Sequence, residues 1–142
     1  MVRLAAITLF AGLIVASGTT ARSADRRQVV LGSPNVVQNA VGWGTAHPRR
    51  IDNGGVPSGK AFNLRWTGWG TSVAHSRGLT WIYTPHGDYY GKPGVIEMRA
   101  YRIGQCIAGG PLAYTRLQIR VARKPGGRLS GWFSWGGWHS IC

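Results

Sequence analysis

The sequence is poor in carboxylates. It has 142 residues, with 17 Lys and Arg. The four acidic residues are Asp25, Asp52, Asp88 and Glu97. Carboxylates are common general acids and bases and the usual ligands of hard metal ions, so few residue sets here could support hydrolysis or metal binding. The formal net charge of +13 favours contact with anionic polymers or surfaces. We expect no metal and no cofactor.

Long apolar runs are also scarce, and the one such run lies at the start. Residues 4–15 are apolar nearly throughout, follow Arg3, and lead into the small and polar residues 16–24. This order predicts a signal peptide, residues 1–24, cleaved near 21–24. The run is shorter than the roughly 20 residues that cross a bilayer. No later segment is apolar enough to span, so we expect a secreted or envelope-associated protein; an uncleaved anchor is the alternative.

Only two cysteines occur, Cys106 and Cys142. In the oxidising environment that export implies, they are expected to form a disulfide, which would contribute roughly 3–4 kcal/mol by closing a long loop. Two free thiols are the alternative. The histidines stand at 47, 75, 86 and 139, and a metal site built from the two cysteines alone is a still poorer alternative.

No stretch of the chain has the apolar spacing of an amphipathic helix, whereas short alternating runs are common. In residues 95–103, Ile96, Met98 and Ala100 are expected on one face and Glu97 and Arg99 on the other. In residues 111–122, alternation places 117, 119 and 121 inward. Further strands are predicted at 28–32, 35–39, 62–66, 79–83 and 132–138, with a loop at 41–58 and a turn at 124–127. This pattern predicts an all-β fold.

Several short strands without crossover helices indicate a small antiparallel β-sandwich or barrel, closed by the one disulfide. The mature chain has the size of one domain. Residues 25–59 are expected to supply N-terminal strands and a loop rich in Gly and Pro, and residues 60–142 the core of the β domain.

Residues 54–61 nearly spell a phosphate-binding loop of the G-x-x-x-x-G-K-[ST] type. Ala61 lacks the hydroxyl that would hold Mg²⁺, and a strand rather than a helix is predicted to follow. Without a helix N-terminus the anion site loses its dipole and its amides. We expect a plain turn here and no nucleotide as a partner.

Tryptophan is abundant, with seven residues, and each ring N–H needs a hydrogen-bond partner when buried. Trp66 and Trp81 are predicted to lie in the core. Trp132, Trp135 and Trp138 are interleaved with Gly and Ser, and these three are candidates for an exposed platform on which a ligand stacks. The alternative is that they too are core residues.

Basic residues are scattered, but one group can gather. Arg116 and Arg120 share a strand face and are followed by Arg123, Lys124 and Arg128 in the predicted turn region. These five residues are the candidate anion-binding stripe. A solvated outer sheet face is the alternative, and no motif for specific nucleic-acid recognition is present.

Few sets of side chains in this sequence could support catalysis, and we assign no catalytic residue. The conceivable sets are His86 with Asp88 on a glycine turn, or Glu97 facing Arg99. The structural alternative is that Glu97 pairs with cross-strand arginines and that residues 86–88 form a simple turn. A small secreted hydrolase, such as a nuclease or a glycan-cleaving enzyme, therefore remains a second hypothesis.

Residues 64–70 read Leu-Arg-Trp-Thr-Gly-Trp-Gly and are followed by Ala74 and Gly78. With Cys106 and the terminal Ile141–Cys142, this pattern resembles small secreted actinobacterial proteins of uncharacterised function, over about residues 60–142. The resemblance implies export and a β-rich domain, and brings no activity with it.

The sequence thus favours a secreted, non-enzymatic, basic β domain that binds the cell envelope or another anionic polymer. Its alternatives are the small hydrolase and an antimicrobial protein acting on membranes.

Overall fold

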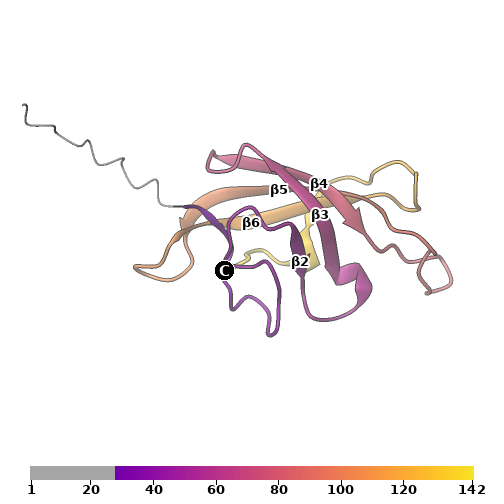
Figure 1. Ribbon diagram of the computed structural model, residues 1–142, viewed down its shortest axis with the longest axis horizontal. Coiled ribbons are helices and arrows are strands. Elements are labelled where there is room, and N and C mark those ends of the chain that lie inside the picture. Colours follow the sequence, from indigo (N-terminus) through magenta and orange to yellow (C-terminus); the bar gives the residue numbers. More distant parts are fainter. Residues whose placement is uncertain (1–27) are drawn as a thin grey trace, which may run out of the picture.

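The computed structural model describes residues 28–142, so the predicted signal peptide lies outside the described residues. One mixed sheet has the order β1-β6-β5-β4-β3-β2, with β7 paired to β6 (Figure 1). The strands are β1 (Val30–Leu31), β2 (Arg50–Asp52), β3 (Lys60–Thr67), β4 (Val73–Thr80), β5 (Gly94–Gln105), β6 (Leu112–Val121) and β7 (Phe133–Ser134). Two short 3-10 helices, η1 (Pro57–Gly59) and η2 (Trp135–Gly137), complete the elements. The all-β prediction is confirmed.

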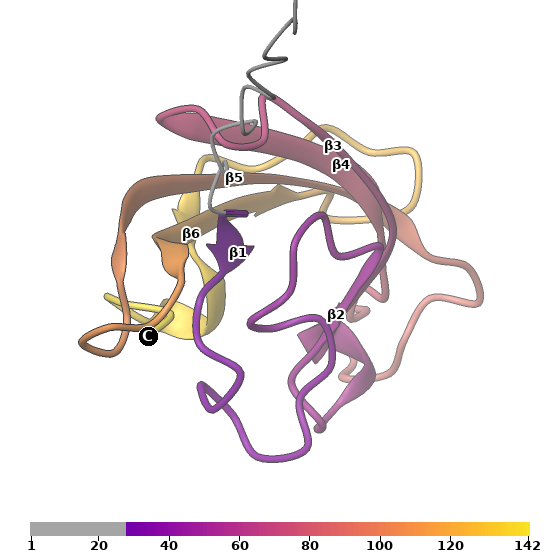
Figure 2. The same ribbon diagram turned by 60° about the vertical axis from the view of Figure 1, so that its left-hand side comes forward.

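The sheet is antiparallel except at one edge, where β1 runs parallel to β6. It curls strongly, and the N-terminal segment lies under its concave side (Figure 2). That segment connects the two edges: Leu31 of β1 exchanges hydrogen bonds with Gly44 and Thr45, and Val41 exchanges two with Asp52 of β2. The sheet is therefore closed in the manner of a small barrel, and residues 28–59 belong to the same unit as residues 60–142.

The core fills the concave side. Ile96, Met98 and Ala100 of β5 are buried, as are Leu117 and Ile119 of β6. The alternation predicted for these two strands is confirmed. Tyr114 of β6 is buried as well, and other strands and loops supply further large buried side chains, which are Leu31, Trp43, Ile51, Leu64, Trp135 and Ile141.

Strand β4 does not alternate between apolar and polar residues. Its buried positions hold the small or polar residues Ala74, Ser76 and Thr80. At Gly78 an added Cβ would lie 2.6 Å from the carbonyl oxygen of Phe62. The prediction of a strand at 79–83 was wrong in its bounds, because close approach to β3 requires small residues and leaves no apolar pattern to find.

Three other predictions need correction. Residues 35–39 form turns and not a strand, since Asn39 adopts a left-handed backbone with φ 58°. The predicted loop 41–58 contains strand β2. The predicted strand 132–138 is extended only at β7, because Gly136 (φ 59°) turns the chain into η2.

The disulfide between Cys106 and Cys142 is present and confirms the predicted pairing. The chain beside it is held by the backbone as well: Ile141 donates to the Thr115 carbonyl and its own carbonyl accepts from Ser33. Ile141 is buried in the core. The covalent link thus joins the residue after β5 to a terminal segment that is hydrogen-bonded to β6 and to Ser33 after β1. Among residues 28–142, no helix is long and apolar enough to cross a membrane.

Candidate functional site

The outer, convex face of the sheet carries a row of charged side chains across four strands. The register places Arg65 of β3 opposite Arg77 of β4, Arg77 opposite Glu97 of β5, and Glu97 opposite Arg120 of β6. Neighbouring strands lie about 4.8 Å apart. Three arginines and one glutamate therefore stand side by side across the sheet.

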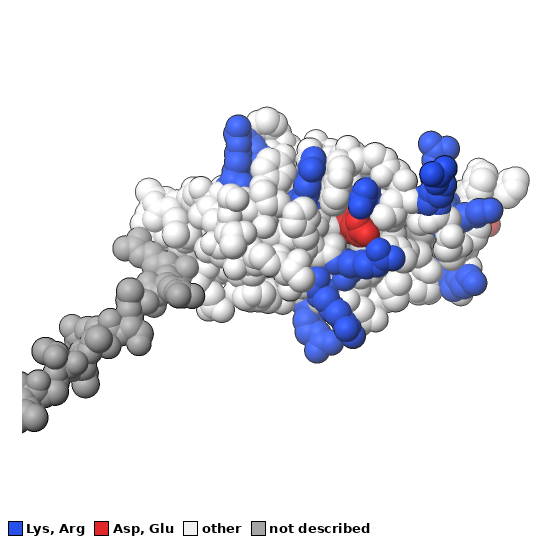
Figure 3. Space-filling view, turned by 90° about the horizontal axis from the view of Figure 1, so that it is seen from above, with Lys and Arg blue, Asp and Glu red and all other residues white. Residues whose placement is uncertain are grey.

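Two further rows follow along the strands. The second runs Thr67, His75, Arg99 and Gln118, and in the third Tyr101 lies opposite Arg116. We call the outward side chains of Arg65, Arg77, Arg99, Arg116 and Arg120, together with Glu97, the arginine face. Figure 3 views the molecule from this side and shows basic side chains around an acidic patch.

Glu97 lies at the centre of an ion-pair network. Its side chain is 19 % exposed; Oε1 accepts from Arg77 at 2.7 Å, and Oε2 accepts from Arg120 at 2.6 and 2.9 Å. Arg99 donates to the side-chain oxygen of Gln118 at 2.8 Å. The pairing of Glu97 with cross-strand arginines, the structural alternative to catalysis, is confirmed. One carboxylate serves two guanidinium groups, so the network keeps a positive charge.

Trp132 covers part of the arginine face. The guanidinium carbons of Arg99 and Arg120 lie 4.6 and 4.9 Å from its ring centroid, and the ring is half-buried. Such cation–π contacts hold both guanidinium groups against the indole. Trp132 is thus the one member of the predicted stacking group that lies beside the arginines.

The other two members lie elsewhere, so a shared exposed platform is not formed. Trp135 is only 2 % exposed, packs edge-on to Trp43, and donates its indole N–H to Asn53 at 3.1 Å. Trp138 is half-buried and also packs against Trp43. The reason is the turn of η2, which directs the chain inward directly after β7.

Trp66 and Trp81 were predicted for the core, and both are more exposed than that prediction requires. Trp66 is half-buried at the edge of the core and donates to the Pro48 carbonyl. Trp81 is half-buried outside the main cluster. The fully buried indoles are instead those of Trp43 and Trp135.

The predicted stripe is only partly on this face. Arg116 and Arg120 do share it, and Arg116 donates to the backbone oxygen of His139. Arg123, Lys124 and Arg128 are exposed in the loop after β6, where Arg123 and Arg128 border a separate hollow.

The remaining arginines of the face, Arg65, Arg77 and Arg99, were not among the predicted site residues. Arg65 and Arg99 occupy outward positions of the predicted strands 62–66 and 95–103, and that phase was the signal for them. Arg77 lies on β4, which stands between those two strands and brings them together. That strand has no apolar alternation and was not recognised in full.

The turn that carries His86 and Asp88, one of the two conceivable catalytic sets, is exposed. His86 and Asp88 lie between Tyr83 and Tyr89, and these two tyrosines form an isolated β-bridge. Within residues 28–142, no hydrogen bond joins the side chain of His86 to that of Asp88. His75 and Glu97 both border a depression of about 200 Å³. No hydrogen bond connects them in the described structure.

Residues 54–61 form a bend, the short helix η1 and the start of β3, in agreement with the predicted turn and strand. Within the described range 28–142, no group of three or more His, Cys, Asp or Glu side chains lies close enough to hold a metal ion. Neither protein-family models, nor curated proteins, nor solved structures give a match to this chain.

Proposed function

We propose that the chain is a secreted, non-enzymatic binding domain that uses the arginine face to bind an anionic polymer of the cell envelope. The observation that carries the proposal is the uncompensated charge in the first row. Arg65 stands directly opposite Arg77, and the only carboxylate of that row, Glu97, is shared by Arg77 and Arg120. Like charges opposite each other on a sheet are destabilising, and an added anion relieves that repulsion.

The spacing of the face suits a linear polymer. Outward residues repeat at about 6.6 Å along a strand and about 4.8 Å across strands. A chain with one phosphate or carboxylate in each repeat unit can therefore meet several guanidinium groups at once. Arginine binds such groups through two parallel hydrogen bonds, which favours it over lysine for this purpose.

Trp132 supports the same proposal. Its ring lies over Arg99 and Arg120 and remains partly exposed, so a sugar or other ring of the polymer can contact it next to the charges. Export, as the N-terminal segment and the resemblance to secreted actinobacterial proteins imply, would bring this face to the envelope.

The test is a pull-down on purified anionic wall polymer across a salt series. The double variant Arg65→Gln/Arg77→Gln should lose most of its retention at low salt. The matched control, Arg49→Gln/Lys92→Gln, removes the same charge from exposed sites outside the face and should be retained like the unmodified protein. Equal loss in both variants would mean that net charge alone is responsible, and no retention at low salt would end the proposal.

A small hydrolase is the second candidate, favoured by the depression that His75 and Glu97 share with Arg65 and Arg77. In a phosphodiester hydrolase a carboxylate acts as base and guanidinium groups stabilise the charged transition state. Here both Glu97 oxygens already accept hydrogen bonds from arginines, which opposes that role. Cleavage of single-stranded RNA that Glu97→Gln and His75→Ala each abolish would establish it; an unchanged substrate ends it.

A further inference from the structure

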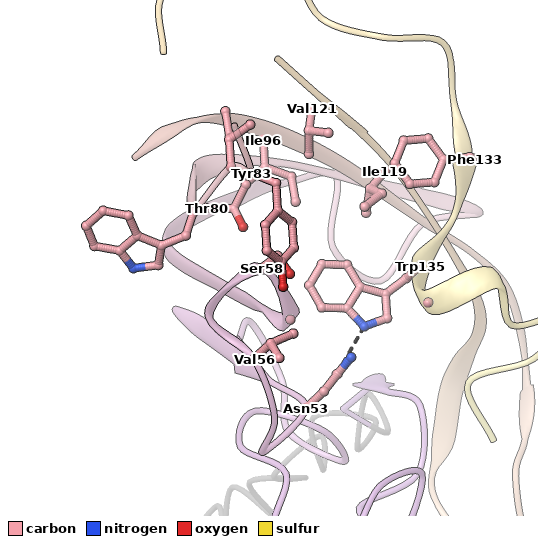
Figure 4. A pocket seen from close by; sticks show the side chains of 14 residues that line it. Asn53, Val56, Ser58, Thr80, Tyr83, Ile96, Ile119, Val121, Phe133 and Trp135 are labelled. Carbon is pink, nitrogen blue, oxygen red and sulfur yellow. Dashed lines mark hydrogen bonds between the residues drawn. The ribbon is translucent and has the colours of Figure 1, made fainter. Parts of the chain in front are cut away.

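A cavity of about 370 Å³ opens on the concave side of the sheet (Figure 4). Its inner wall is formed by the core side chains of Ile96 and Ile119, and the ring of Trp135 stands at one side. We call it the aromatic cavity. Its lining residues are Asn53, Val56, Ser58, Gly59, Thr80, Trp81, Ile82, Tyr83, Ile96, Ile119, Val121, Phe133, Trp135 and Gly136.

None of these lining residues is charged, although the chain carries 17 Lys and Arg. The arginine face lies on the other side of the same strands, since Ile96 and Ile119 point inward where Glu97 and Arg120 point outward. An anion would find no positively charged side chain among these lining residues and would lose its hydration there. The chemistry of the walls therefore selects an uncharged ligand.

The mouth of the cavity exposes apolar side chains to solvent. Val56, Tyr83 and Phe133 are 56 %, 44 % and 46 % exposed, and all three border it. They come from the loop before η1, from the segment after β4 and from β7, so three separate parts of the chain converge there. Apolar surface gathered around an opening is typical of a ligand site, whereas single exposed apolar residues are not.

The rings at the cavity are held in place. Tyr83 stacks on Tyr89 with their centroids 4.4 Å apart. The indole N–H of Trp135 donates to the side-chain oxygen of Asn53 at 3.1 Å, drawn as a dashed line in Figure 4. This bond uses the oxygen of Asn53 and leaves its amide nitrogen able to donate to a ligand at the wall.

We propose that the aromatic cavity binds a small uncharged ring compound with one hydrogen-bond acceptor directed at Asn53. The volume lies within the range of ligand pockets, about 300–1,000 Å³, and exceeds the roughly 150 Å³ that holds a single benzene ring. Aromatic walls add edge-to-face and offset contacts with the rings of such a ligand. The inference does not depend on the arginine face binding a polymer.

Titration with 6-propionyl-2-(dimethylamino)naphthalene, an uncharged fluorescent ring compound whose ketone oxygen is a hydrogen-bond acceptor, tests the proposal. Saturable binding of one probe per chain is expected. Val56→Asp and Phe133→Asp place a charge at the mouth on already exposed side chains, and each should weaken the Kd about tenfold or more. Ile107→Asp is the matched control, because Ile107 is 60 % exposed and outside the cavity, and its Kd should be unchanged.

Inorganic polyphosphate added to the complex of protein and probe should not displace the probe, because the aromatic cavity and the arginine face lie on opposite sides of the sheet. Non-saturable uptake, an equal loss of affinity in Ile107→Asp, or displacement by polyphosphate would each overturn the inference. Circular dichroism of every variant checks that the sheet is intact, and the two mouth variants serve as replacements for each other if one fails to fold.

Discussion

Asp52 is a buried carboxylate in a chain that has only three others, and both of its oxygens accept hydrogen bonds. It accepts hydrogen bonds from Arg50 at 2.6 Å and from the Gly54 backbone N–H at 2.8 Å, with Lys60 at 3.7 Å. Burial acts to raise the pKa of Asp52, but the Arg50 and Gly54 hydrogen bonds and the two nearby positive charges together hold it below its ordinary value. The ionised form thus stabilises the junction of β2 with the following loop.

Asp52→Asn should lower the free energy of unfolding by about 1–3 kcal/mol at neutral pH. Because the pKa of Asp52 is lower in the folded state, its contribution is complete above the unfolded pKa and is lost as the pH falls through the folded one. The difference between the two proteins should therefore shrink below about pH 4. Urea unfolding at neutral and acid pH measures it, and a difference that does not change with pH contradicts the assignment.

Glu97 lies between Arg77 and Arg120 in the first row. Glu97→Gln should lower the free energy of unfolding by about 1 kcal/mol, since it removes the shared partner of Arg77 and Arg120, both partly exposed. Salt screens the repulsion that remains, so the loss should be larger at about 0.01 M than at about 1 M ionic strength. The same variant should bind polyphosphate more tightly. Weaker binding would show that Glu97 does not compete with the phosphates of the polymer for Arg77 and Arg120.

At the scale of elements, the strands with apolar alternation could be predicted and the others could not. β5 and β6 each bury alternate large side chains, so their bounds and faces were found nearly in full. β4 buries small residues and β2 is three residues long, so neither leaves a periodic signal. The arginine rows depend on the register of β4 and on the irregularity between Phe62 and Arg65 in β3, which the sequence does not specify.

Gly78 tests the close approach of β3 and β4. Gly78→Ala places a Cβ 2.6 Å from the Phe62 carbonyl oxygen and 2.8 Å from a methyl carbon of Leu64, so the strands must separate. We expect a loss of about 1–3 kcal/mol in the free energy of unfolding. Gly91→Ala is the control, because nothing lies within 4 Å of its added Cβ and its backbone has no positive φ. Denaturant curves in which both variants match the unmodified protein would refute the packing.

For the whole molecule, the disulfide is the feature that the sequence predicted best, because only one pairing was possible. It closes a loop of 36 residues. The double variant Cys106→Ala/Cys142→Ala should lose roughly 3–4 kcal/mol of unfolding free energy by the loop-entropy estimate. The unmodified protein under reducing conditions should behave in the same way. A variant as stable as the unmodified protein would show that the backbone bonds of Ile141 alone hold the terminal segment.

The central strands of the curled sheet carry charged side chains on one side and apolar side chains on the other. The convex side carries five arginines around Glu97, and the concave side encloses an apolar core and an uncharged cavity. Net charge and tryptophan content could be read from the sequence. Which indoles face solvent could not, because the inward turn at η2 buries Trp135 while its neighbour Trp132 stays outside.

The most direct measurement is the salt dependence of binding to inorganic polyphosphate, compared between Arg65→Gln/Arg77→Gln and Arg49→Gln/Lys92→Gln. The log of the binding constant falls linearly with the log of the salt concentration, and each phosphate contact makes this slope steeper by roughly 0.7–0.9. Loss of two contacts should therefore reduce the slope of the first variant by about 1.5, while the second keeps the slope of the unmodified protein. Equal slopes in all three proteins would contradict a binding site on the arginine face.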